Sequence, residues 1–534
     1  MRNLFKFKLT RPKTPNVGAV TEFEKKQLSG AVFGPLPSGG PDFVELFIND
    51  TPVLKSPLRI DTAGNASFTI GMYDVWRFAK ISDLISVRYA DRSLPMPDRH
   101  LARHPERNGK ENLDLLRERF DAGQAFDDRG RITKLSKDLD HTWQHGVMSL
   151  YGEVDEVIRK VTGRSSFIFS GTLLGYVRDN GFIPHDKDMD CAYVSAKTSI
   201  PEVMREFAAL GDALIAAGYA VTPKASCISV RRKAGSKVMV DVAHLFLKSD
   251  GTVGFPFGRV GIEAVEPALF LPVGVGKLSG YSVGVPAQPE DVVEHVYGTD
   301  WRVPDPAFKW RERRRSRDPQ PLLDRSTRTR IAMDDLYSRP ETIEPSAFAR
   351  WLAGWELLPD LGVVMDLGCG NGRDLHTLVG AADKVIGIDR SPYAIKAATQ
   401  LAAGDEAIDV RQGDVLHPGT IRDLSEAAAF GKPRLFYARF VLNGLTDDEQ
   451  EHFLVQLRGA LRPGDLVAFE HRTNQDEQLK KARFRSFRRF IDTDAFAGRL
   501  EELDLEVVHR QEGTGLAPFE REDPHVVRLV AKLP

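Results

Sequence analysis

Cysteine is scarce in this chain, and the few cysteines form no recognisable pattern. The sequence of 534 residues has three, Cys191, Cys227 and Cys369, and no two of them make a CxxC pair. Zinc modules and disulfide frameworks need regularly spaced cysteines, so neither is expected. A reducing compartment such as the cytoplasm fits this usage best.

Long apolar runs and an excess of charge are also missing. No segment reaches about 18 consecutive apolar residues, the length of a membrane-spanning helix. The first residues, MRNLFKFKLTRPKTPN, are basic but lack the apolar core of a signal peptide. The formal net charge of -2 gives no global attraction to nucleic acid or to anionic membranes. Any membrane contact is therefore expected to be peripheral.

The chain is long enough for about three domains of ordinary size. Over residues 1–105, short apolar runs such as FVELFIND and ASFTIGM alternate with turn residues, which predicts a small β-sandwich. Acceptor binding and a purely structural role both stay open for this accessory module. From about residue 110 to 163 the apolar spacing becomes helical, and these helices are expected to pack on the sheet of a second domain, over 106–305.

The densest pattern runs from Gly171 to Asp190, GTLLGYVRDNGFIPHDKDMD. Gly171 and Thr172 are small residues, and a segment about as long as one helix separates them from Asp186, Asp188 and Asp190. The apolar residues after Asp190 predict a buried strand. On a strand, side chains alternate, so the three carboxylates would share one face. Carboxylates so close repel one another, which favours a bound divalent cation. A solvated acidic turn is the alternative.

This segment resembles the LicD/fukutin family of phosphotransferases with a nucleotidyltransferase fold. The matching features, in chain order, are Gly171–Gly175, Arg178, Gly181–Pro184 and Asp186–Asp190. Two later segments agree, VMVDVAHLF with Asp241 and YGTDWRVP from Tyr297 to Pro304. Two positions depart from the family pattern. His185 replaces a common aromatic residue, and Lys187 interrupts the acidic run but points to the opposite face, so ligation is expected to survive.

The resemblance implies metal-dependent transfer of a phospho-alcohol, or a related phosphoryl group, from a nucleotide-linked donor to a polysaccharide or lipid-linked glycan. Such chemistry needs positioning and charge neutralisation more than a protein nucleophile, which suits these residues. The implied ligands of Mg²⁺ or Mn²⁺ are Asp186, Asp188, Asp190 and Asp241, the last three also as catalytic residues. Asp241 as a general base is a second option.

Donor binding is expected at the start of the same motif. Gly171 and Thr172 would offer a backbone amide and a hydroxyl to the phosphates of the donor. Arg178 would balance phosphate charge, although an ordinary exposed helix position explains it equally well.

Residues 306–338 are predicted to form a basic linker. Its run KWRERRRSR, Lys309 to Arg317, is strongly basic in a chain that is otherwise balanced. Contact with anionic lipid headgroups or with a charged glycan precursor is one interpretation, and a solvated linker is the other.

A second chemical centre lies in VVMDLGCGNGRDLHTLV, where an apolar strand leads into a glycine-rich turn. Glycines at such a turn let backbone amides approach a ligand closely. The order Asp-Leu-Gly-Cys-Gly-Asn-Gly resembles motif I of class I S-adenosylmethionine-dependent methyltransferases, which implies such a Rossmann-like domain over 339–534. The resemblance implies cofactor binding by Asp366, Gly368, Cys369, Gly370, Gly372, Asp389 and Asp414. Of these, Asp389 ends the next strand, where a carboxylate can accept both ribose hydroxyls.

Residues for the methyl acceptor are harder to read from the sequence. The segment LFYARFVLNGL (Leu435 to Leu445) predicts the fourth strand, and LRPGDLVAFEHR predicts a helix end, a turn and the fifth strand. Tyr437 and Arg439 belong to the first of these segments and His471 ends the fifth strand, at the edge where open α/β sheets bind ligands. Arg439 and His471 are the predicted catalytic residues of this half. With Arg472 and the cluster Arg483, Arg485, Arg488 and Arg489, they predict a positive rim suited to a phosphate-bearing acceptor. A solvated basic face is the alternative for the cluster.

Together the patterns predict a multidomain α/β protein: a β-sandwich, an α+β nucleotidyltransferase-like domain and a Rossmann-like methyltransferase domain. The two transferase domains in one chain suggest a bifunctional enzyme of surface-glycan biosynthesis that modifies one molecule in succession. Two alternatives stay open. One is an enzyme that acts on a small molecule or RNA, although no basic groove favours RNA. The other is a glycan-binding scaffold with one inactive domain.

Overall fold

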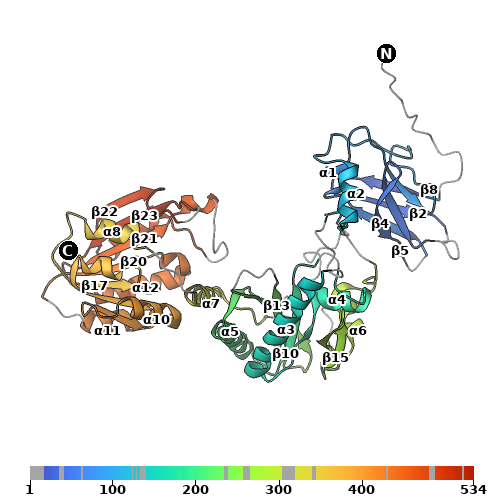
Figure 1. The fold of residues 1–534 in the computed structure, drawn as a ribbon. Coiled ribbons are helices and arrows are strands. Elements are labelled where there is room, and N and C mark those ends of the chain that lie inside the picture. The colour runs from blue at the N-terminus through green and yellow to red at the C-terminus, as the bar shows by residue number, and fades with distance from the viewer. Residues whose placement is uncertain are drawn as a thin grey trace, which may run out of the picture. The chain divides into compact units, whose positions relative to one another are not determined.

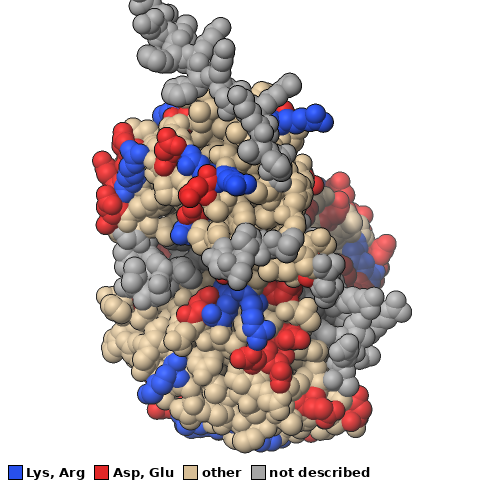
Figure 2. Space-filling model, turned by 90° about the vertical axis from the view of Figure 1, so that its right-hand side faces the viewer, with Lys and Arg blue, Asp and Glu red and all other residues tan. Residues whose placement is uncertain are grey.

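The computed structural model describes most of the chain. The described residues are 17–34, 41–61, 64–122, 124–127, 129–132, 140–183, 186–233, 238–255, 265–303, 319–339, 344–427, 431–479, 488–519 and 522–534. They fall into two compact units, Met1–Glu206 with Ser229–Pro321 and Phe207–Ile228 with Leu322–Pro534. Among the described helices, none combines the length and the apolarity that crossing a membrane requires. On the face in Figure 2, basic and acidic side chains are interspersed, in keeping with the small net charge.

Two antiparallel four-stranded sheets form the β-rich module near the N-terminus (Figure 1). Their strand orders are β1-β2-β6-β5 and β4-β3-β7-β8. The strands are β1 (Gly18–Phe23), β2 (Gln27–Val32), β3 (Phe43–Ile48), β4 (Thr51–Pro57), β5 (Arg59–Ile60), β6 (Ala66–Gly71), β7 (Ile85–Tyr89) and β8 (Arg92–Ser93). Val44 of one sheet and Phe68 of the other lie in the same hydrophobic core. Two sheets that enclose one core are the packing that the sandwich prediction requires.

Two helices complete this module, α1 (Val75–Phe78) and α2 (Leu113–Asp121). Asn112 caps α2, because its side chain accepts a hydrogen bond from the Leu115 amide. Leu116 of α2 is fully buried in the core of the two sheets. The prediction that the helices of residues 110–163 pack on the next domain is therefore wrong for α2, and the predicted boundary at residue 105 cuts through one core.

The central domain is built on a sheet with the strand order β11-β12-β13-β10-β9, and β14 pairs with β13. Its strands are β9 (Phe167–Ile168), β10 (Met189–Ser195), β11 (Tyr219–Pro223), β12 (Cys227–Arg232), β13 (Val240–Leu247) and β14 (Val253–Gly254). A separate hairpin is formed by β15 (Gly274–Leu278) and β16 (Tyr281–Val285). The helices are α3 (His141–Thr162), α4 (Ser170–Arg178), α5 (Ile200–Ala216), the 3-10 turn η1 (Pro267–Leu269) and α6 (Pro289–Tyr297).

Strand β10 is the buried strand that the sequence predicts after the acidic motif. It pairs in parallel with β13, and four of its residues from Cys191 to Val194 are buried. Helix α3 contacts both strands, so the expectation that a preceding helix packs on this sheet is confirmed for α3. The amino ends of two parallel strands thereby come to one edge of the sheet, where the motif lies.

Seven strands form the sheet of the C-terminal domain, in the order β19-β18-β17-β20-β21-β23-β22. Five run parallel, and β23 is antiparallel to both of its neighbours. The strands are β17 (Leu361–Leu367), β18 (Ala382–Asp389), β19 (Ile408–Gln412), β20 (Arg434–Arg439), β21 (Leu466–Arg472), β22 (Glu506–Gly513) and β23 (Val526–Lys532). The apolar strands β17, β18, β20, β21 and β23 lie where the sequence predicts strands, whereas β19 and β22 are mostly polar.

Helices cover both faces of this sheet because its central strand is apolar on both sides. Val363 and Met365 of β17 pack in the core that includes α11, α12 and α13, whereas Leu361 and Val364 pack with α8, α9 and α10. The helices and 3-10 turns are α8 (Ala347–Ala353), α9 (Leu375–Val379), α10 (Pro392–Leu401), α11 (Thr420–Ala427), η3 (Leu442–Gly444), α12 (Asp447–Ala460), η4 (Asn474–Gln478) and α13 (Thr493–Glu502).

Helix α7 (Arg325–Tyr337) lies inside the segment 306–338 that the sequence predicts as a linker. Asp324 caps it, and the carboxylate of Asp335 accepts a hydrogen bond of 2.8 Å from the buried amide of Val221. The helix contacts α10 and β11. The linker interpretation is therefore wrong from Arg325 onward: these residues are packed. The basic run Lys309–Arg317 lies outside the described residues.

Candidate active sites

The acidic motif of the central domain lies where β10 and β13 begin. Asp190 and Asp241 are direct partners in the register of these parallel strands. Asp186, Asp188 and Asp190 are partly exposed, whereas Lys187 is exposed and Met189 is fully buried. Strand β10 begins only at Met189, so the placement of all three carboxylates on one strand face stays a prediction.

Helix α4 positions Asp190. The Gly171 amide donates a hydrogen bond of 3.0 Å to Asp190 Oδ2, and the Asp190 amide donates one of 2.8 Å to Thr172 Oγ1. A carboxylate at a helix N-terminus is stabilised by the unpaired amides and the helix dipole. Gly171 and Thr172 therefore belong to the first turn of helix α4. In this structure they orient Asp190, and the Thr172 side chain is buried. Donor binding by Gly171 and Thr172 stays a prediction.

The environment of Asp186 favours a nearby positive charge. Burial raises the pKa of Asp186 well above its ordinary value, and the charges of Asp190 and Asp188 raise it further, while Arg178 lowers it. One oxygen of Asp186, Oδ2, is buried and has no hydrogen-bond partner among the described residues. Arg178 forms a two-bond ion pair with Asp179, with distances of 3.0 and 2.9 Å. Its side chain is only 14% exposed, so it is not an ordinary surface arginine.

A carboxylate with a buried, unsatisfied oxygen and two acidic neighbours has the donor chemistry that Mg²⁺ or Mn²⁺ takes. No group of three or more His, Cys, Asp or Glu side chains within the described ranges is arranged to hold a metal ion. The metal site is accordingly a prediction for Asp186, Asp188, Asp190 and Asp241. Pro184 and His185 of the motif, and Pro304 of the later segment, lie outside the described residues.

The C-terminal domain has a cavity of about 360 Å³ at the carboxyl end of its parallel strands. Open α/β sheets bind ligands at this edge, beside the point where the strand order reverses. Four predicted residues line it: Gly368, Asp389, Asp414 and Arg439. The other predicted cofactor residues are not on the wall: Asp366 lies near the end of β17, and Cys369, Gly370 and Gly372 lie in the turn that follows.

The glycine-rich turn needs glycine for two separate reasons. Gly368, Gly370 and Gly372 have positive φ angles of 82°, 56° and 80°, which residues with a Cβ atom rarely adopt. In addition, a Cβ atom on Gly370 would lie 2.5 Å from the hydroxyl of Tyr337. The turn therefore follows from local sequence, while its tight fit depends on α7.

Asp389 connects this turn to the cavity. Its two oxygens accept hydrogen bonds from the Gly370 amide at 3.0 Å and from the Ser391 amide at 2.8 Å. Burial raises the pKa of Asp389, and the two amides oppose that effect. Behind the turn, burial raises the pKa of Asp366 well above its usual value, and likewise that of the Cys369 thiol. At the far wall, Asp414 accepts a hydrogen bond of 2.9 Å from the Leu416 amide.

Helix α7 supplies wall residues that the sequence does not reveal. Arg330, Asp334 and Tyr337 line the cavity, and burial raises the pKa of Tyr337. Their segment, RSTRTRIAMDDLY, carries few apolar residues, so its helical pattern is weak. The one available signal is Asp324 followed by residues that suit a capped helix start.

Replacing Tyr337 with alanine is expected to weaken binding of S-adenosylhomocysteine by about tenfold, because it removes one wall of the cavity beside Gly370. Calorimetric titration of the full chain measures the dissociation constant. Tyr393→Ala is the matched control, since Tyr393 lies on α10 outside the cavity wall and should bind as wild type does. Equal affinities for the two variants would contradict a binding role for α7.

The predicted acceptor residues do not all reach the cavity. Arg439 lines it, with Arg472 and Arg488. Tyr437 is buried away from it and donates a hydrogen bond of 2.9 Å to Asp374. His471 is fully buried against Phe496, and burial lowers its pKa to about 4. Because side chains alternate along β21, the structure turns His471 away from the face that carries Arg472.

The remaining arginines of the predicted basic rim also differ in whether they reach the cavity. Arg488 shares Glu522 with Arg472, at 2.5 Å in each case. Arg489 is paired with Asp447 and Gln450. Arg483 and Arg485 lie outside the described residues. Among the described residues of this cluster, only Arg488 lies on the cavity wall.

The sheet order, the glycine turn after its central strand and the acidic residue ending the next strand define a Rossmann-like methyltransferase domain. Comparison with known families gives the same class. Residues 360–425 match the model of a methyltransferase domain, and residues 163–287 match the LicD/FKTN/FKRP nucleotidyltransferase domain. The chain thus combines a LicD-type nucleotidyltransferase domain with a C-terminal methyltransferase domain.

Solved structures similar to the chain include two methyltransferases, both at low sequence identity. One is an S-adenosylmethionine-dependent methyltransferase from Anabaena variabilis, at 18% identity over 36% of this chain and 88% of that chain, with a TM-score of 0.30. Another is the N-methyltransferase NodS from Bradyrhizobium japonicum, at 18% identity over 33% and 87% of the two chains, with a TM-score of 0.25. No curated protein sequence matches the chain.

Proposed function

We propose that the chain is a bifunctional cytoplasmic transferase of surface-glycan biosynthesis. Its LicD-type domain transfers a phospho-alcohol or phosphoryl substituent from a nucleotide-linked donor to a polysaccharide or lipid-linked glycan. Its methyltransferase domain then methylates that substituent or a nearby sugar. The observation that carries the proposal is the joining of the two transferase domains in one chain, with a cofactor-sized cavity in one and an acidic edge in the other.

For the first reaction, Asp186, Asp188, Asp190 and Asp241 would hold Mg²⁺ or Mn²⁺. The ion would supply charge neutralisation at the phosphoryl group and alignment of the attacking hydroxyl. Helix α4 fixes Asp190 through Gly171 and Thr172, so the carboxylate keeps its direction when the metal arrives. Arg178 lies close enough to Asp186 to lower its pKa, and it would also counter the charge of the donor phosphates.

For the second reaction, S-adenosylmethionine supplies an activated methyl group, and the domain has to align it with the acceptor. Asp389 would accept hydrogen bonds from the ribose hydroxyls, and Asp414 would lie near the adenine. The turn from Gly368 to Gly372 lets the backbone approach the ligand closely. These roles are supported by the positions of Gly368, Asp389 and Asp414 on the wall of one cavity.

The experiment that tests the proposal is mass spectrometry of the surface glycan from cells that carry the wild type or one of two double variants. Asp188→Ala/Asp190→Ala should remove a phosphorylated substituent. Asp366→Ala/Asp389→Ala should remove only a methyl group from the same part of the glycan. An unchanged glycan in both cases would overturn the assignment and turn the search to small-molecule or RNA acceptors.

A further inference from the structure

Arginine is the most frequent charged residue on the wall of the methyltransferase cavity. The wall carries six arginines, Arg330, Arg373, Arg390, Arg439, Arg472 and Arg488. Four acidic residues face the same space, Asp334, Asp389, Asp414 and Glu522. A cavity with more guanidinium groups than carboxylates attracts anions.

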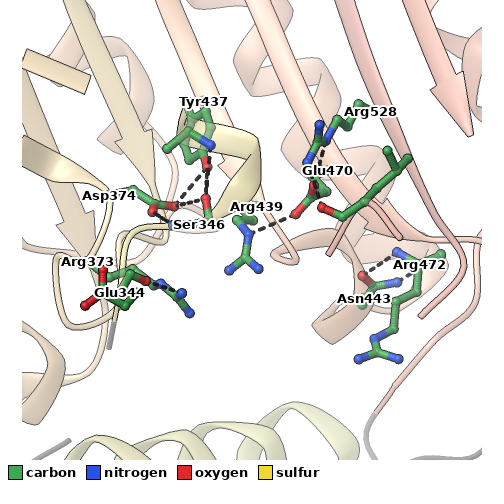
Figure 3. A network of polar contacts seen from close by, with 12 residues as sticks. Glu344, Ser346, Arg373, Asp374, Tyr437, Arg439, Asn443, Glu470, Arg472 and Arg528 are labelled. Carbon is green, nitrogen blue, oxygen red and sulfur yellow. Dashed lines mark hydrogen bonds and ion pairs between the residues drawn. The ribbon is translucent and has the colours of Figure 1, made fainter. Parts of the chain in front are cut away.

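The buried carboxylate of Glu470 holds only one edge of the Arg439 guanidinium group. Its Nε donates a hydrogen bond of 2.9 Å to Glu470, which is almost fully buried and also accepts a hydrogen bond of 3.1 Å from Arg528. The terminal nitrogens of Arg439 have no hydrogen-bond partner among the described residues, and the side chain lies on the cavity wall. Figure 3 shows its guanidinium directed away from Glu470. One edge of the planar group is thereby fixed while the other faces the cavity.

Arg373 lies on the wall of the same cavity. Its guanidinium donates to the backbone carbonyl of Glu344, which carries no net charge. Burial lowers the pKa of Arg373, and the positive charge of Arg439 lowers it further. Two partly buried cations that repel each other are stabilised when an anion binds between them. In Figure 3 the guanidinium groups of both arginines lie on the same side of the network.

Arg472 and Phe440 also line the cavity near Arg439. Arg472 is already paired with Asp476 at 2.8 Å and with Glu522 at 2.5 Å, so it contributes less to an unfilled anion site. Phe440 lies under two guanidiniums, 4.5 Å from Arg439 and 5.6 Å from Arg472. Its φ angle of 57° is unusual for an aromatic residue, and such strain is common at ligand sites.

We propose that the methyl acceptor is an anionic oxygen, of a phosphate monoester or a carboxylate, held by Arg373 and Arg439. This inference deepens the proposed function and rests on it for the glycan as carrier. In the step, a lone pair of the anionic oxygen forms the new bond to the methyl carbon. The bond from that carbon to sulfur breaks, and its electron pair stays on sulfur. The products are a methyl ester and S-adenosylhomocysteine, and no proton is released.

This chemistry agrees with the position of His471. An alcohol or an ammonium group must lose a proton to accept a methyl group, whereas an anionic oxygen needs no proton acceptor. His471 is buried against Phe496 and is not among the residues of the cavity wall. Planar guanidinium groups can bind the oxygens that do not react, and they leave the third oxygen of a phosphate free to attack.

The linkage of the methyl group tests the proposal directly. Cells with the wild type or Asp389→Ala are grown on methionine with a ¹³C-labelled methyl group, and the label that depends on the wild type is located in the glycan and in the small-molecule extract. A ¹³C–³¹P coupling identifies a methyl phosphate, and methanol released by mild alkali identifies a methyl carboxylate; both support the inference. A methyl group that shows no coupling and resists alkali is an ether or an N-methyl group and overturns it.

The two proposals fail differently in this experiment. An ester-linked label found only in small molecules contradicts the glycan assignment and supports the anionic acceptor. An ether-linked label in the glycan does the reverse. Absence of any label that depends on the wild type contradicts both.

Arginine variants test whether Arg373 and Arg439 bind the methyl acceptor or the carboxylate of the cofactor. Arg373→Gln and Arg439→Gln should each lower the rate of methyl transfer to the labelled product by about 100-fold. This is the rate loss expected when a charge-assisted hydrogen bond to the reacting group is removed. Their affinity for S-adenosylhomocysteine, measured by calorimetry, should equal that of the wild type, which also shows that the fold is intact. Arg499→Gln, on α13 and paired with Glu451, is the control and should leave transfer unchanged. If affinity and transfer fall together, the arginines bind the cofactor's carboxylate and the proposal is wrong.

Discussion

Asp190→Asn is expected to lower phosphoryl transfer by the LicD-type domain by about 1000-fold, because a metal ligand that stabilises the transition state by several kcal/mol is lost. Asparagine has nearly the same volume and keeps an oxygen that can accept the hydrogen bond from the Gly171 amide. The first turn of α4 should therefore stay in place while the charge disappears. Transfer is measured as phosphate incorporated into the isolated glycan, with Mg²⁺ present and after its removal with a chelator.

Asp250→Asn is the matched control for this experiment. Asp250 is exposed and follows β13 at the end opposite to Asp241. Its loss of charge should leave transfer and its metal dependence unchanged. Wild-type transfer by the Asp190→Asn variant, or transfer that persists in the chelator, would contradict the metal-dependent mechanism.

Asp389→Ala is expected to weaken S-adenosylhomocysteine binding by at least about 100-fold, since two charge-assisted hydrogen bonds of roughly 1.5 kcal/mol or more each are removed. A second effect adds to this loss. The Gly370 and Ser391 amides both donate to Asp389, so the alanine variant leaves them unpaired and the glycine turn less well ordered. Calorimetric titration gives the affinity, and the thermal midpoint of the full chain reports the change in stability.

Asp389→Asn separates the two effects. The amide side chain keeps one acceptor for the backbone, so stability should recover more than affinity does. Asp383→Ala on the same strand is the control, because Asp383 is exposed and pairs with Lys432 far from the cavity. If Asp389→Ala binds the ligand as tightly as Asp383→Ala does, the proposed cofactor role of Asp389 is wrong.

Much of the fold was predictable because its signals are local. Strands β17, β20, β21 and β23 of the C-terminal sheet are apolar runs, and β10 follows the acidic motif as an apolar segment. The positive φ angles of Gly368, Gly370 and Gly372 also belong to the chain itself, since only glycine adopts them without strain. Period-two alternation applies only from Met189 onward, where β10 begins, so the shared face of Asp186, Asp188 and Asp190 stays a prediction.

The errors arose where partners come from distant parts of the chain. Leu116 of α2 is apolar at helical spacing, which predicts a buried face but not that the β-rich module buries it. Helix α7 has few apolar residues of its own. It is held by contacts such as Asp335 with the Val221 amide, 114 positions earlier, so no local pattern distinguished it from a linker.

The sequence by itself determined the chemistry that each half of this protein carries: an acidic edge after a helix, and a glycine turn after an apolar strand. Only the tertiary structure decided which groups meet. It turned Gly171 and Thr172 toward Asp190, buried His471 against Phe496, and brought Arg373 and Arg439 to one cavity. The reason is that side-chain direction depends on strand register and on helix packing, and both arise from contacts between segments far apart in the chain.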